Sequence, residues 1–274
     1  MDLHLHSTAS DGQLAAAEVV ARAHATGLGA IALTDHDSVE GVAEAVSAGE
    51  RVGVRVVAGC EFSVAAPWGE MHVLGYFLPV GHDEVEAFLH RCRADRVRRG
   101  EAMASRLTDL GLPISFGAIL DEAAGGAVGR PHVARALVRA GAATSVNDAF
   151  DRFLGRGRPA FVDKTLPAFT EVAELVHRVS GVLSAAHLRD RANRPTLERL
   201  KREGLDAVEV RHPRHDPETR SRIAGLANVL DLARTGGSDW HGDEPLPDDH
   251  GALGSQTVPA EWLERLEARR PRAA

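Results

Sequence analysis

The sequence is poor in the residues that build disulfide frameworks and membrane helices. Its 274 residues include only two cysteines, Cys60 and Cys92, and they do not form a CxxC pair. Such a pair of cysteines provides neither a disulfide framework nor a cysteine-based zinc motif. No apolar run approaches the roughly 20 residues that a membrane helix needs. The opening residues Asp2-Leu3-His4 lead us to expect no signal peptide. We therefore expect a protein of the reducing cytoplasm with no membrane partner.

The sequence also lacks an excess of positive charge. Its formal net charge is -7, with 44% hydrophobic and 26% charged residues. This balance argues against broad, nonspecific binding to nucleic acid, although it permits a local basic patch. The length suits one large domain or a domain with an insertion. No obligate protein partner is evident.

Strand-like and helix-like segments alternate in two parts of the chain. This alternation predicts a parallel sheet or barrel with helices outside it. The predicted strands are residues 3–6, 30–34, 54–62, 71–78, 182–187, 207–210 and 229–235. The predicted helices are residues 14–26, 39–48, 171–179, 196–203, 218–226 and 261–270.

Between these two parts, residues 83–165 are helical in character and interrupted by glycines. We predict a barrel domain over residues 1–82 and 166–274, with residues 83–165 as a helical insertion that caps the barrel mouth. The long helical run at 84–110 carries several arginines, which we expect on a solvated face. These are Arg96, Arg98, Arg99 and Arg106.

Residues with metal-binding side chains lie at or just after the ends of the predicted strands. His4–Leu5–His6 opens the series and Asp239–Trp240–His241 closes it. In a strand, residues i and i+2 project to the same face, so each pair can serve one ion. Active sites of parallel barrels lie at the carboxyl ends of the strands. The single candidates between the two pairs are Asp11, His36, Glu61, His72 and His187.

This set of ligands predicts a hydrolase with two or three metal ions. Carboxylates bridge ions and imidazoles fill the outer positions in such sites. Neighbouring ions lower the pKa of a shared water and stabilise a phosphoryl group under attack. Ser7 and Ser63 flank candidate ligands but lack the GxSxG context of a serine nucleophile.

Seven motifs resemble the PHP (polymerase and histidinol phosphatase) family. They are DLHLHSTASDG at 2–12, LTDHD at 33–37, GCEFS at 59–63, HVLGY at 72–76, GRPHVARALV at 129–138, AAHL at 185–188 and GGSDWHG at 236–242. The resemblance implies a distorted (β/α)7 TIM-like barrel with a helical insertion. The GRPHVAR block further resembles stand-alone PHP phosphoesterases that act on nucleotides and short oligonucleotides.

The resemblance also implies three neighbouring metal sites, and histidine-rich ligation suits Mn, Zn or Fe. The first comprises His4, His6, Glu61 and Asp239; Glu61 bridges to a second with His72 and His187; the third comprises Asp11, His36 and His241. Two departures from the family pattern stand out. Asp11 replaces a histidine found in some members, and Leu188 follows His187 where proline is common. Asp35 and Asp37 flank His36 and are predicted to orient imidazoles by hydrogen bonds.

Several residues are candidates for contacts with substrate. Arg130 and His132 lie at a predicted helix start, which suits a phosphate, or else they tie that helix to a carboxylate. With Asp11 and His187 they form the predicted catalytic set. Arg211 follows a strand and is a further candidate. Trp68 and Trp240 offer faces for a base or ordinary packing. The histidines outside the motifs are expected not to bind metal: His24, His82, His90, His177, His212, His215 and His250.

The predicted activity is hydrolysis of nucleotide phosphate esters by a metal-bridging hydroxide. 3′,5′-Bisphosphonucleotides or the 5′ end of short RNA are the favoured substrates. One alternative is a phosphatase of a small metabolite such as histidinol phosphate. Another is a noncatalytic, metal-stabilised module that binds a nucleotide or a protein partner.

Overall fold

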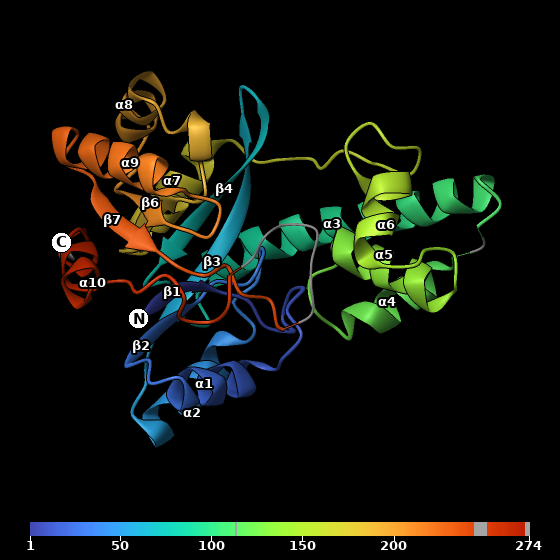
Figure 1. Cartoon of the computed structure of the whole chain (residues 1–274), viewed down its shortest axis with the longest axis horizontal. Coiled ribbons are helices and arrows are strands. Elements are labelled where there is room, and N and C mark those ends of the chain that lie inside the picture. The colour runs from blue at the N-terminus through green and yellow to red at the C-terminus, as the bar shows by residue number, and fades with distance from the viewer. Residues whose placement is uncertain (113, 244–250, 272–274) are drawn as a thin grey trace.

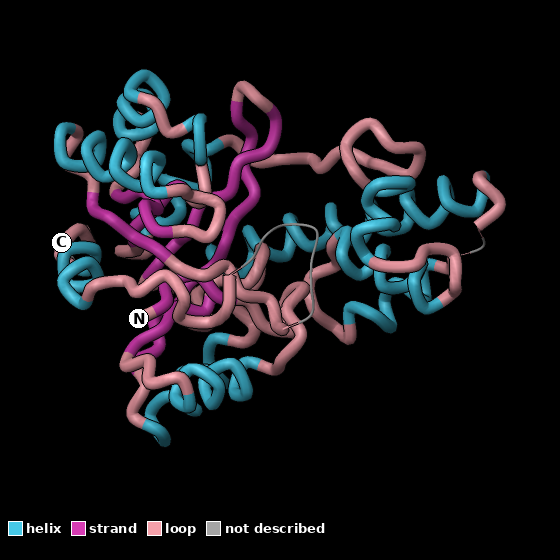
Figure 2. The backbone as a smooth tube through the Cα atoms, viewed as in Figure 1, coloured by secondary structure: helices cyan, strands magenta, loops and turns pink. Residues whose placement is uncertain are grey.

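A curled seven-stranded sheet forms the centre of the molecule, with helices against its outer face (Figures 1 and 2). The computed structural model describes residues 1–112, 114–243 and 251–271; His250, expected not to bind metal, lies outside them. The strands follow chain order as neighbours. They are β1 (Asp2–Leu5), β2 (Ala30–Leu33), β3 (Arg55–Ala66), β4 (Gly69–Tyr76), β5 (Val182–Ala185), β6 (Ala207–Arg211) and β7 (Ala233–Gly236).

The expectation of a wholly parallel sheet is wrong at β4. This strand pairs antiparallel with both β3 and β5, whereas the other neighbouring pairs are parallel. A short connection at 67–68 returns the chain directly beside β3 as a hairpin, and a parallel pairing would need a longer crossover. His72 therefore lies near the beginning of its strand. Glu61 lies inside the 12-residue β3 and not at its end.

The two edges of the sheet approach each other where β1 and β7 end. The amide of His6 donates to Trp240 O at 3.1 Å, and the amide of Asp239 donates to His4 O at 2.9 Å. Gly237 permits this approach, because an added Cβ would lie 2.3 Å from the Cβ of His4. The curl thereby brings the first and last ligand pairs together.

Helices on the outer face bury apolar stripes against the sheet. They are α1 (Ala16–Ala25), α2 (Val42–Val52), α7 (Phe169–Arg178), α8 (Arg194–Arg202), α9 (Pro217–Val229) and α10 (Ala260–Glu267). Gly53 ends α2 in the left-handed conformation, at φ 76°. The side chains of Asn193 and Asp216 cap α8 and α9, and a proline lies in the first two positions of each helix, as Pro195 and Pro217. Within the described residues, no helix combines the length and apolar character required to cross a bilayer.

Residues 83–165 extend to one side of the sheet (Figure 1). They contain α3 (Asp83–Asp109), α4 (Phe116–Ala123), α5 (Arg130–Arg139), α6 (Val146–Ala149) and the π-helical turn Phe150–Leu154. Val85, Phe88 and Leu89 at the start of α3 pack into the core of the sheet. Its later residues Met103 and Leu107 pack into a second apolar cluster with α4 and α5. α3 is therefore shared between the two cores.

The prediction of a fully solvated arginine face on α3 is wrong for two of its four residues. Arg96 and Arg99 are only 4% and 5% exposed. The Arg96 Nε donates to Asp37 Oδ2 at 2.7 Å, and the Arg99 Nε donates to Val162 O at 2.7 Å. Both arginines face inward, where α3 crosses from the sheet to the second cluster. Arg98 and Arg106 remain exposed.

Candidate metal centre

Glu61 lies at the middle of a buried group of histidines. Its Oε2 is 3.3 Å from the Nε2 atoms of His4 and His6 and 3.0 Å from His36 Nδ1. Its Oε1 is 3.0 Å from His72 Nδ1 and 3.1 Å from His187 Nε2. The two carboxylate oxygens thus face different sets of imidazoles, which is the arrangement expected of a carboxylate that bridges two ions.

Asp239 and Asp11 extend this group on two sides. Asp239 Oδ1 is 3.2 Å from the Nε2 atoms of both His4 and His6. Asp11 Oδ1 is 3.3 Å from His241 Nε2. Among the described residues, four sets offer ligand atoms that lie within 4.8 Å of one another inside each set: His6, Asp11, His36 and His241; His4, His6, Glu61 and Asp239; His4, Glu209 and His212; and His36, Glu61 and His72.

All nine predicted ligands therefore converge, although they come from segments far apart in the sequence. The grouping differs in detail from the prediction. His36 faces both Glu61 and the group around Asp11, and His6 belongs to two of the four sets. The reversal of β4 explains why His72 reaches the same rim, since the amino-terminal part of an antiparallel strand lies beside the carboxyl ends of its parallel neighbours.

The donor atoms themselves indicate a cation. Five atoms in the cluster are buried and have no hydrogen-bond partner among the described residues: His4 Nε2, His6 Nε2, Asp11 Oδ1, His36 Nδ1 and Glu61 Oε2. Buried polar atoms in proteins are nearly always satisfied. These atoms converge on shared centres, and imidazole and carboxylate groups are the ligands that Zn, Mn and Fe accept. The residues fit divalent ions.

Electrostatics favour the ionised form of the two central carboxylates. Burial raises the pKa of Glu61, but His36, His4 and His72 hold it well below its usual range. Burial likewise opposes ionisation of Asp11, and His36 and His241 hold its pKa well below normal. A metal ligand must be deprotonated. Both side chains are therefore in the form that binds a cation.

Two side chains of the cluster, His212 and Glu209, were not identified from the sequence. His212 was expected not to bind metal, yet it is fully buried with Nε2 3.3 Å from Asp239 Oδ2. Glu209 Oε1 is 3.1 Å from His4 Nδ1, and its Oε2 accepts from the His187 amide at 2.8 Å. Glu209 lies within β6 between the buried Val208 and Val210, so a carboxylate in an otherwise apolar strand segment was the available signal.

Glu209 performs the role that was assigned to Asp35 and Asp37. Its carboxylate contacts the ring nitrogen of His4 that faces away from Glu61, which fixes the ring orientation. Asp35 accepts from the Ser7 amide and the Ser7 and Ser10 hydroxyls, at 2.6–2.7 Å, and reaches His6 only through Ser10. Asp37 pairs with Arg96 and accepts from the Ser63 amide. These two aspartates therefore hold loops. Among the described residues, neither of them forms a direct hydrogen bond to an imidazole.

A second network fixes His72. Its Nε2 lies 3.1 Å from Glu70 Oε1, while its Nδ1 faces Glu61. Lys164 contacts the same Glu70 oxygen and donates to Ser63 Oγ at 2.9 Å. Burial lowers the pKa of Lys164 to about 8. The pKa of Glu70 stays far below normal despite burial, because Lys164 and His72 stabilise its anion. Lys164 and Glu70 were not identified from sequence.

The three residues that were predicted to contact substrate lie in different surroundings. Arg130 is half-buried, lines the cavity above the cluster and lies over the Phe150 and Phe161 rings, at 5.5 and 5.7 Å. His132 is 1% exposed and its Nδ1 accepts from the Gly129 amide at 2.9 Å. Burial lowers its pKa to about 4. His132 is thus a buried, neutral residue that caps α5, and it is not among the residues lining this cavity.

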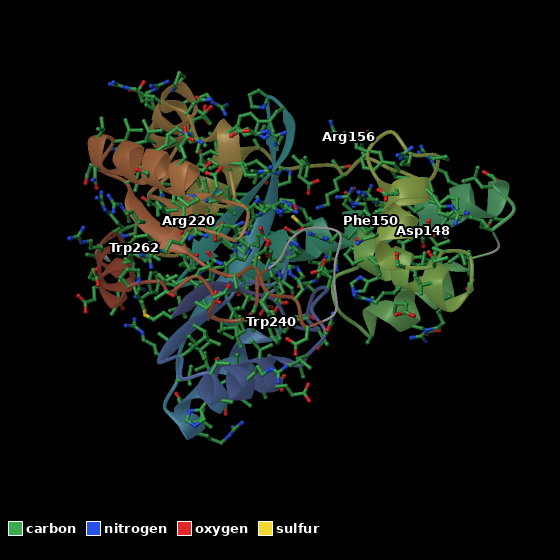
Figure 3. All side chains as sticks on the ribbon, in the orientation of Figure 1. Asp148, Phe150, Arg156, Arg220, Trp240 and Trp262 are labelled. Atoms are coloured by element: carbon green, nitrogen blue, oxygen red, sulfur yellow. The ribbon has the colours of Figure 1, made fainter. Side chains whose placement is uncertain are left out.

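Arg211, predicted to contact substrate, faces away from the cluster. Its guanidinium donates to the carbonyl oxygens of Gln256 and Thr257 and lies 5.3 Å from the Trp262 ring centroid. It therefore faces the C-terminal helix (Trp262 is labelled in Figure 3) and not the cluster. Trp240 is 2% exposed and packs in the core, so its ring offers no open face for a base. Trp68 is half-buried and lines an open pocket.

A curled α/β sheet with buried imidazoles and carboxylates at one rim defines a barrel-like metal-binding protein. The comparison with known families agrees: the PHP domain model matches residues 2–210. The chain belongs to the PHP domain family. It is similar to a 5′-3′ exoribonuclease of Haemophilus influenzae, with 33% identity over 88% of this chain and 89% of the relative. It is also similar to a 3′,5′-nucleoside bisphosphate phosphatase of Chromobacterium violaceum, with 31% identity over 88% and 87%.

Two solved structures have the same fold along nearly their full length. A protein from Bifidobacterium adolescentis, described as a metal-dependent phosphoesterase, superposes with a TM-score of 0.89 at 31% identity, covering 98% of this chain and 96% of that one. A protein from Chromobacterium violaceum, described as an amidohydrolase with bound sulfate, superposes with a TM-score of 0.83 at 29% identity, covering 100% and 98%. The expected relation to stand-alone PHP phosphoesterases is confirmed.

Proposed function

We propose that this protein is a metal-dependent phosphoesterase that hydrolyses phosphate esters of nucleotides. The substrates are 3′,5′-bisphosphonucleotides or the 5′ end of short RNA. One observation carries the proposal: Glu61 faces two sets of imidazoles through its two oxygens, below a cavity lined by cationic side chains. The names of the relatives, an exoribonuclease and a nucleotide phosphatase, support the same chemistry.

Two or three divalent ions, Mn, Zn or Fe, fit the donor set. The proposed ligands are His4, His6, Asp11, His36, Glu61, His72, His187, Asp239 and His241, joined by His212. When bound, such ions lower the pKa of a bound water toward ~7 and neutralise charge on the phosphoryl group.

The chain's own residues then position the phosphate. Arg130, Arg96, Arg99 and Lys164 line a cavity of about 140 Å³ together with Asp11, His36, Glu61 and His187. These cations offset the negative charge of a phosphoryl group in a site largely shielded from water, where such interactions are strongest. Arg130 has the donor geometry to hold two phosphate oxygens at once. His132 supports it by fixing the first turn of α5.

Asp11 and His187 are proposed to move protons at the reacting atoms. Both line the cavity. Burial lowers the pKa of His187, so its imidazole is neutral near pH 7 and can accept a proton. Asp11 is ionised and close to His241, where it can orient an attacking water by accepting its hydrogen. Asp11 has two oxygens, so it can hold an ion with one and a water with the other. A neutral imidazole has a single nitrogen lone pair, so proton transfer by His187 is an alternative to metal binding by this residue.

Residues 1–82 and 166–274 are proposed to form the distorted (β/α)7 barrel domain, with residues 83–165 as a helical insertion that caps its mouth. The second apolar cluster supports this division. Arg130 supports the capping role, because it reaches the cavity from α5.

The two cysteines form no disulfide with each other, which suits the reducing cytoplasm.

A side-by-side assay tests the function. Purified protein is analysed for Mn, Fe and Zn and then given a 3′,5′-bisphosphonucleotide, a short 5′-phosphorylated RNA and histidinol phosphate. Release of phosphate or nucleotide from either of the first two, dependent on metal, is the expected result. Preference for histidinol phosphate would reassign the substrate. Absence of turnover on all three by fully metallated protein would refute the enzyme and favour a binding module.

A further inference from the structure

Two adjoining cavities of different size lie over the cluster. The inner one, next to Glu61 and Asp11, has a volume of about 140 Å³. The outer one has a volume of about 470 Å³. They are neighbours, since five residues line both: Glu70, His72, Arg130, His187 and Arg214. A substrate bound at the inner cavity can therefore extend directly into the outer one.

The inner cavity is smaller than an ordinary ligand pocket. Its volume of about 140 Å³ suits a phosphoryl group better than a whole nucleotide. Ligand pockets in proteins span ~300–1,000 Å³, and the outer cavity falls inside that range. The part of the substrate beyond the reacting phosphate must occupy the outer cavity.

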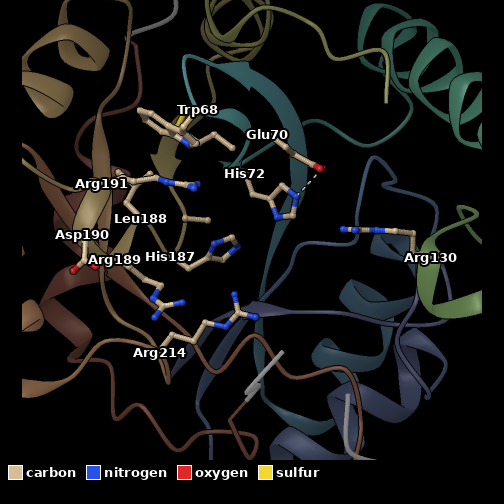
Figure 4. A pocket seen from close by; sticks show the side chains of 12 residues that line it. Trp68, Glu70, His72, Arg130, His187, Leu188, Arg189, Asp190, Arg191 and Arg214 are labelled. Atoms are coloured by element: carbon tan, nitrogen blue, oxygen red, sulfur yellow. Dashed lines mark hydrogen bonds and ion pairs between the residues drawn. The ribbon is translucent and has the colours of Figure 1, made fainter. Parts of the chain in front are cut away.

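The outer cavity has the chemistry to hold a second anion and a base. Its lining includes four arginines and two carboxylates, in a chain whose formal net charge is -7. Figure 4 shows Arg189, Arg191 and Arg214 on one side of the pocket, with Arg130 across from them. Arg191 lies over Trp68, with 5.3 Å between its guanidinium carbon and the ring centroid. Bases stack readily on aromatic rings and on guanidinium planes.

The loop that carries Arg189 and Arg191 is held in an unusual conformation. His187 and Arg189 both have positive φ, at 31° and 52°, a conformation that residues other than glycine rarely adopt. The loop is tied down from α9 and its preceding turn. The Arg189 amide donates to His215 Nε2 at 3.2 Å, and Arg222 donates to Arg189 O at 3.2 Å. The same turn therefore aims His187 at Glu61 and places the arginines outside it.

We propose that Trp68, Arg189 and Arg191 form a subsite for a nucleoside and the second phosphate attached to it. The subsite rests on the proposed function and narrows it: the preferred substrate carries two phosphates separated by a nucleoside. A 3′,5′-bisphosphonucleotide and an oligonucleotide both have this chemistry. A simple monoester reaches the inner cavity but leaves the subsite empty.

The test compares Arg191→Ala and Trp68→Ala with wild-type protein and with Arg202→Ala. Arg202 is exposed at the end of α8 and lines neither cavity, so its variant makes the same charge change elsewhere. The substrates are p-nitrophenyl phosphate, a 3′,5′-bisphosphonucleotide and a 5′-phosphorylated RNA trinucleotide. Loss of a base-stacking or phosphate contact predicts a kcat/KM lower by about 10- to 100-fold, mainly through KM. This loss is expected on substrates with two phosphates, and turnover of p-nitrophenyl phosphate stays within about twofold.

The outcome also identifies the source of the second phosphate. A loss confined to the trinucleotide assigns the subsite to the next nucleotide of an RNA, and a loss confined to the bisphosphonucleotide assigns it to that nucleotide. Equal loss on all three substrates, or none on any, overturns the proposal.

Failure of the subsite is distinguishable from failure of the proposed function. If wild-type protein hydrolyses neither nucleotide substrate, equilibrium binding of a phosphorothioate-linked, 5′-phosphorylated trinucleotide reports on the subsite by itself. The expected Kd is about 10-fold higher for Arg191→Ala than for Arg202→Ala. Identical Kd values overturn the subsite.

Discussion

The rim of the sheet and the helical segment 83–165 contribute opposite charges to the same cavity. The rim presents carboxylates and imidazoles, which are buried and face one another around Glu61. The helical segment and its return to the sheet present Arg96, Arg99, Arg130 and Lys164. The first set suits cations and the second suits anions. A metal site and a phosphate site thus come from different parts of the chain and meet at one surface.

This difference separates two ways to inactivate the protein. Changes at the rim should remove ions, and changes on the helical side should remove phosphate contacts while leaving the ions in place. Measuring metal content and kinetics on the same preparation distinguishes them.

Glu61→Gln should be the most damaging substitution. It removes the charge of the proposed bridging carboxylate, whose two oxygens face five histidines. We expect kcat/KM to fall by on the order of 10³-fold, with fewer ions retained per chain by elemental analysis. Glu174→Gln, the same change on the exposed surface of α7, is the control. Unchanged ion content and turnover in Glu61→Gln would contradict the metal centre.

Arg130→Ala should lower kcat/KM by about 10²-fold, because a two-pronged contact to phosphate is lost. Its ion content should match that of wild-type protein. Arg130→Lys keeps the charge without the planar fork and should recover only part of the activity. Arg139→Ala, at the exposed end of the same helix, controls for general effects on α5. Loss of ions from Arg130→Ala would show that the phosphate contacts of the helical segment cannot be removed without disturbing the metal site of the rim.

Glu70→Gln tests the junction between the two regions. Glu70 contacts His72 of the rim and Lys164 of the returning segment. Removing a carboxylate that orients a metal-binding histidine typically weakens metal affinity by 10- to 100-fold. We expect a loss near the lower end of that range, measured by competition with a chelator. An unaltered affinity would mean that the backbone alone positions His72.

The pH dependence of stability gives the smallest effect. His132 has a folded-state pKa of about 4, against ~6.5 in an unfolded chain, because it is buried. Below pH 6.5 the unfolded chain binds more protons, so stability is full above that pH and declines as the pH falls toward 4. At pH 5.5 the contribution of His132 is lower by about 1 kcal/mol.

Denaturant unfolding of wild-type protein and His132→Gln at pH 7.5 and 5.5 measures this difference. The variant should lose less stability than wild-type protein between the two pH values. Identical losses would mean that the pKa of His132 does not differ between the folded and the unfolded chain.

Much of the rim was predictable because strand periodicity is strict. His4 and His6 share a face for the same reason that Leu3 and Leu5 share the other, and the residue types at those positions indicate metal. The direction of β4 was not predictable from its composition, which is equally apolar in either direction. The two-residue connection at 67–68 held the information, since it is too short for a crossover to a parallel strand.

The cations of the cavity were mostly missed, because their placement depends on tertiary packing. Arg96 and Arg98 lie on one helix with similar neighbours, yet Arg96 is buried against Asp37 and Arg98 is exposed. Helix spacing alone could not decide which face of α3 meets the sheet, since residues 83–165 pack partly on their own cluster. Lys164 and Arg214 lie outside regular helices and strands, where sequence periodicity offers no signal.

The contact between β1 and the end of β7 sets an order of events during synthesis. The amide of Ser238 donates to Asp2 Oδ1, a bond between residues 236 positions apart. At 5–20 residues per second, translation of that interval takes roughly 10–50 s. A nascent chain that carries His4 and His6 lacks Asp239 and His241 for all of that time. The complete ligand set therefore forms only after Asp239 and His241 have been translated. An ion bound to it would hold these two distant segments together and stabilise them against local opening.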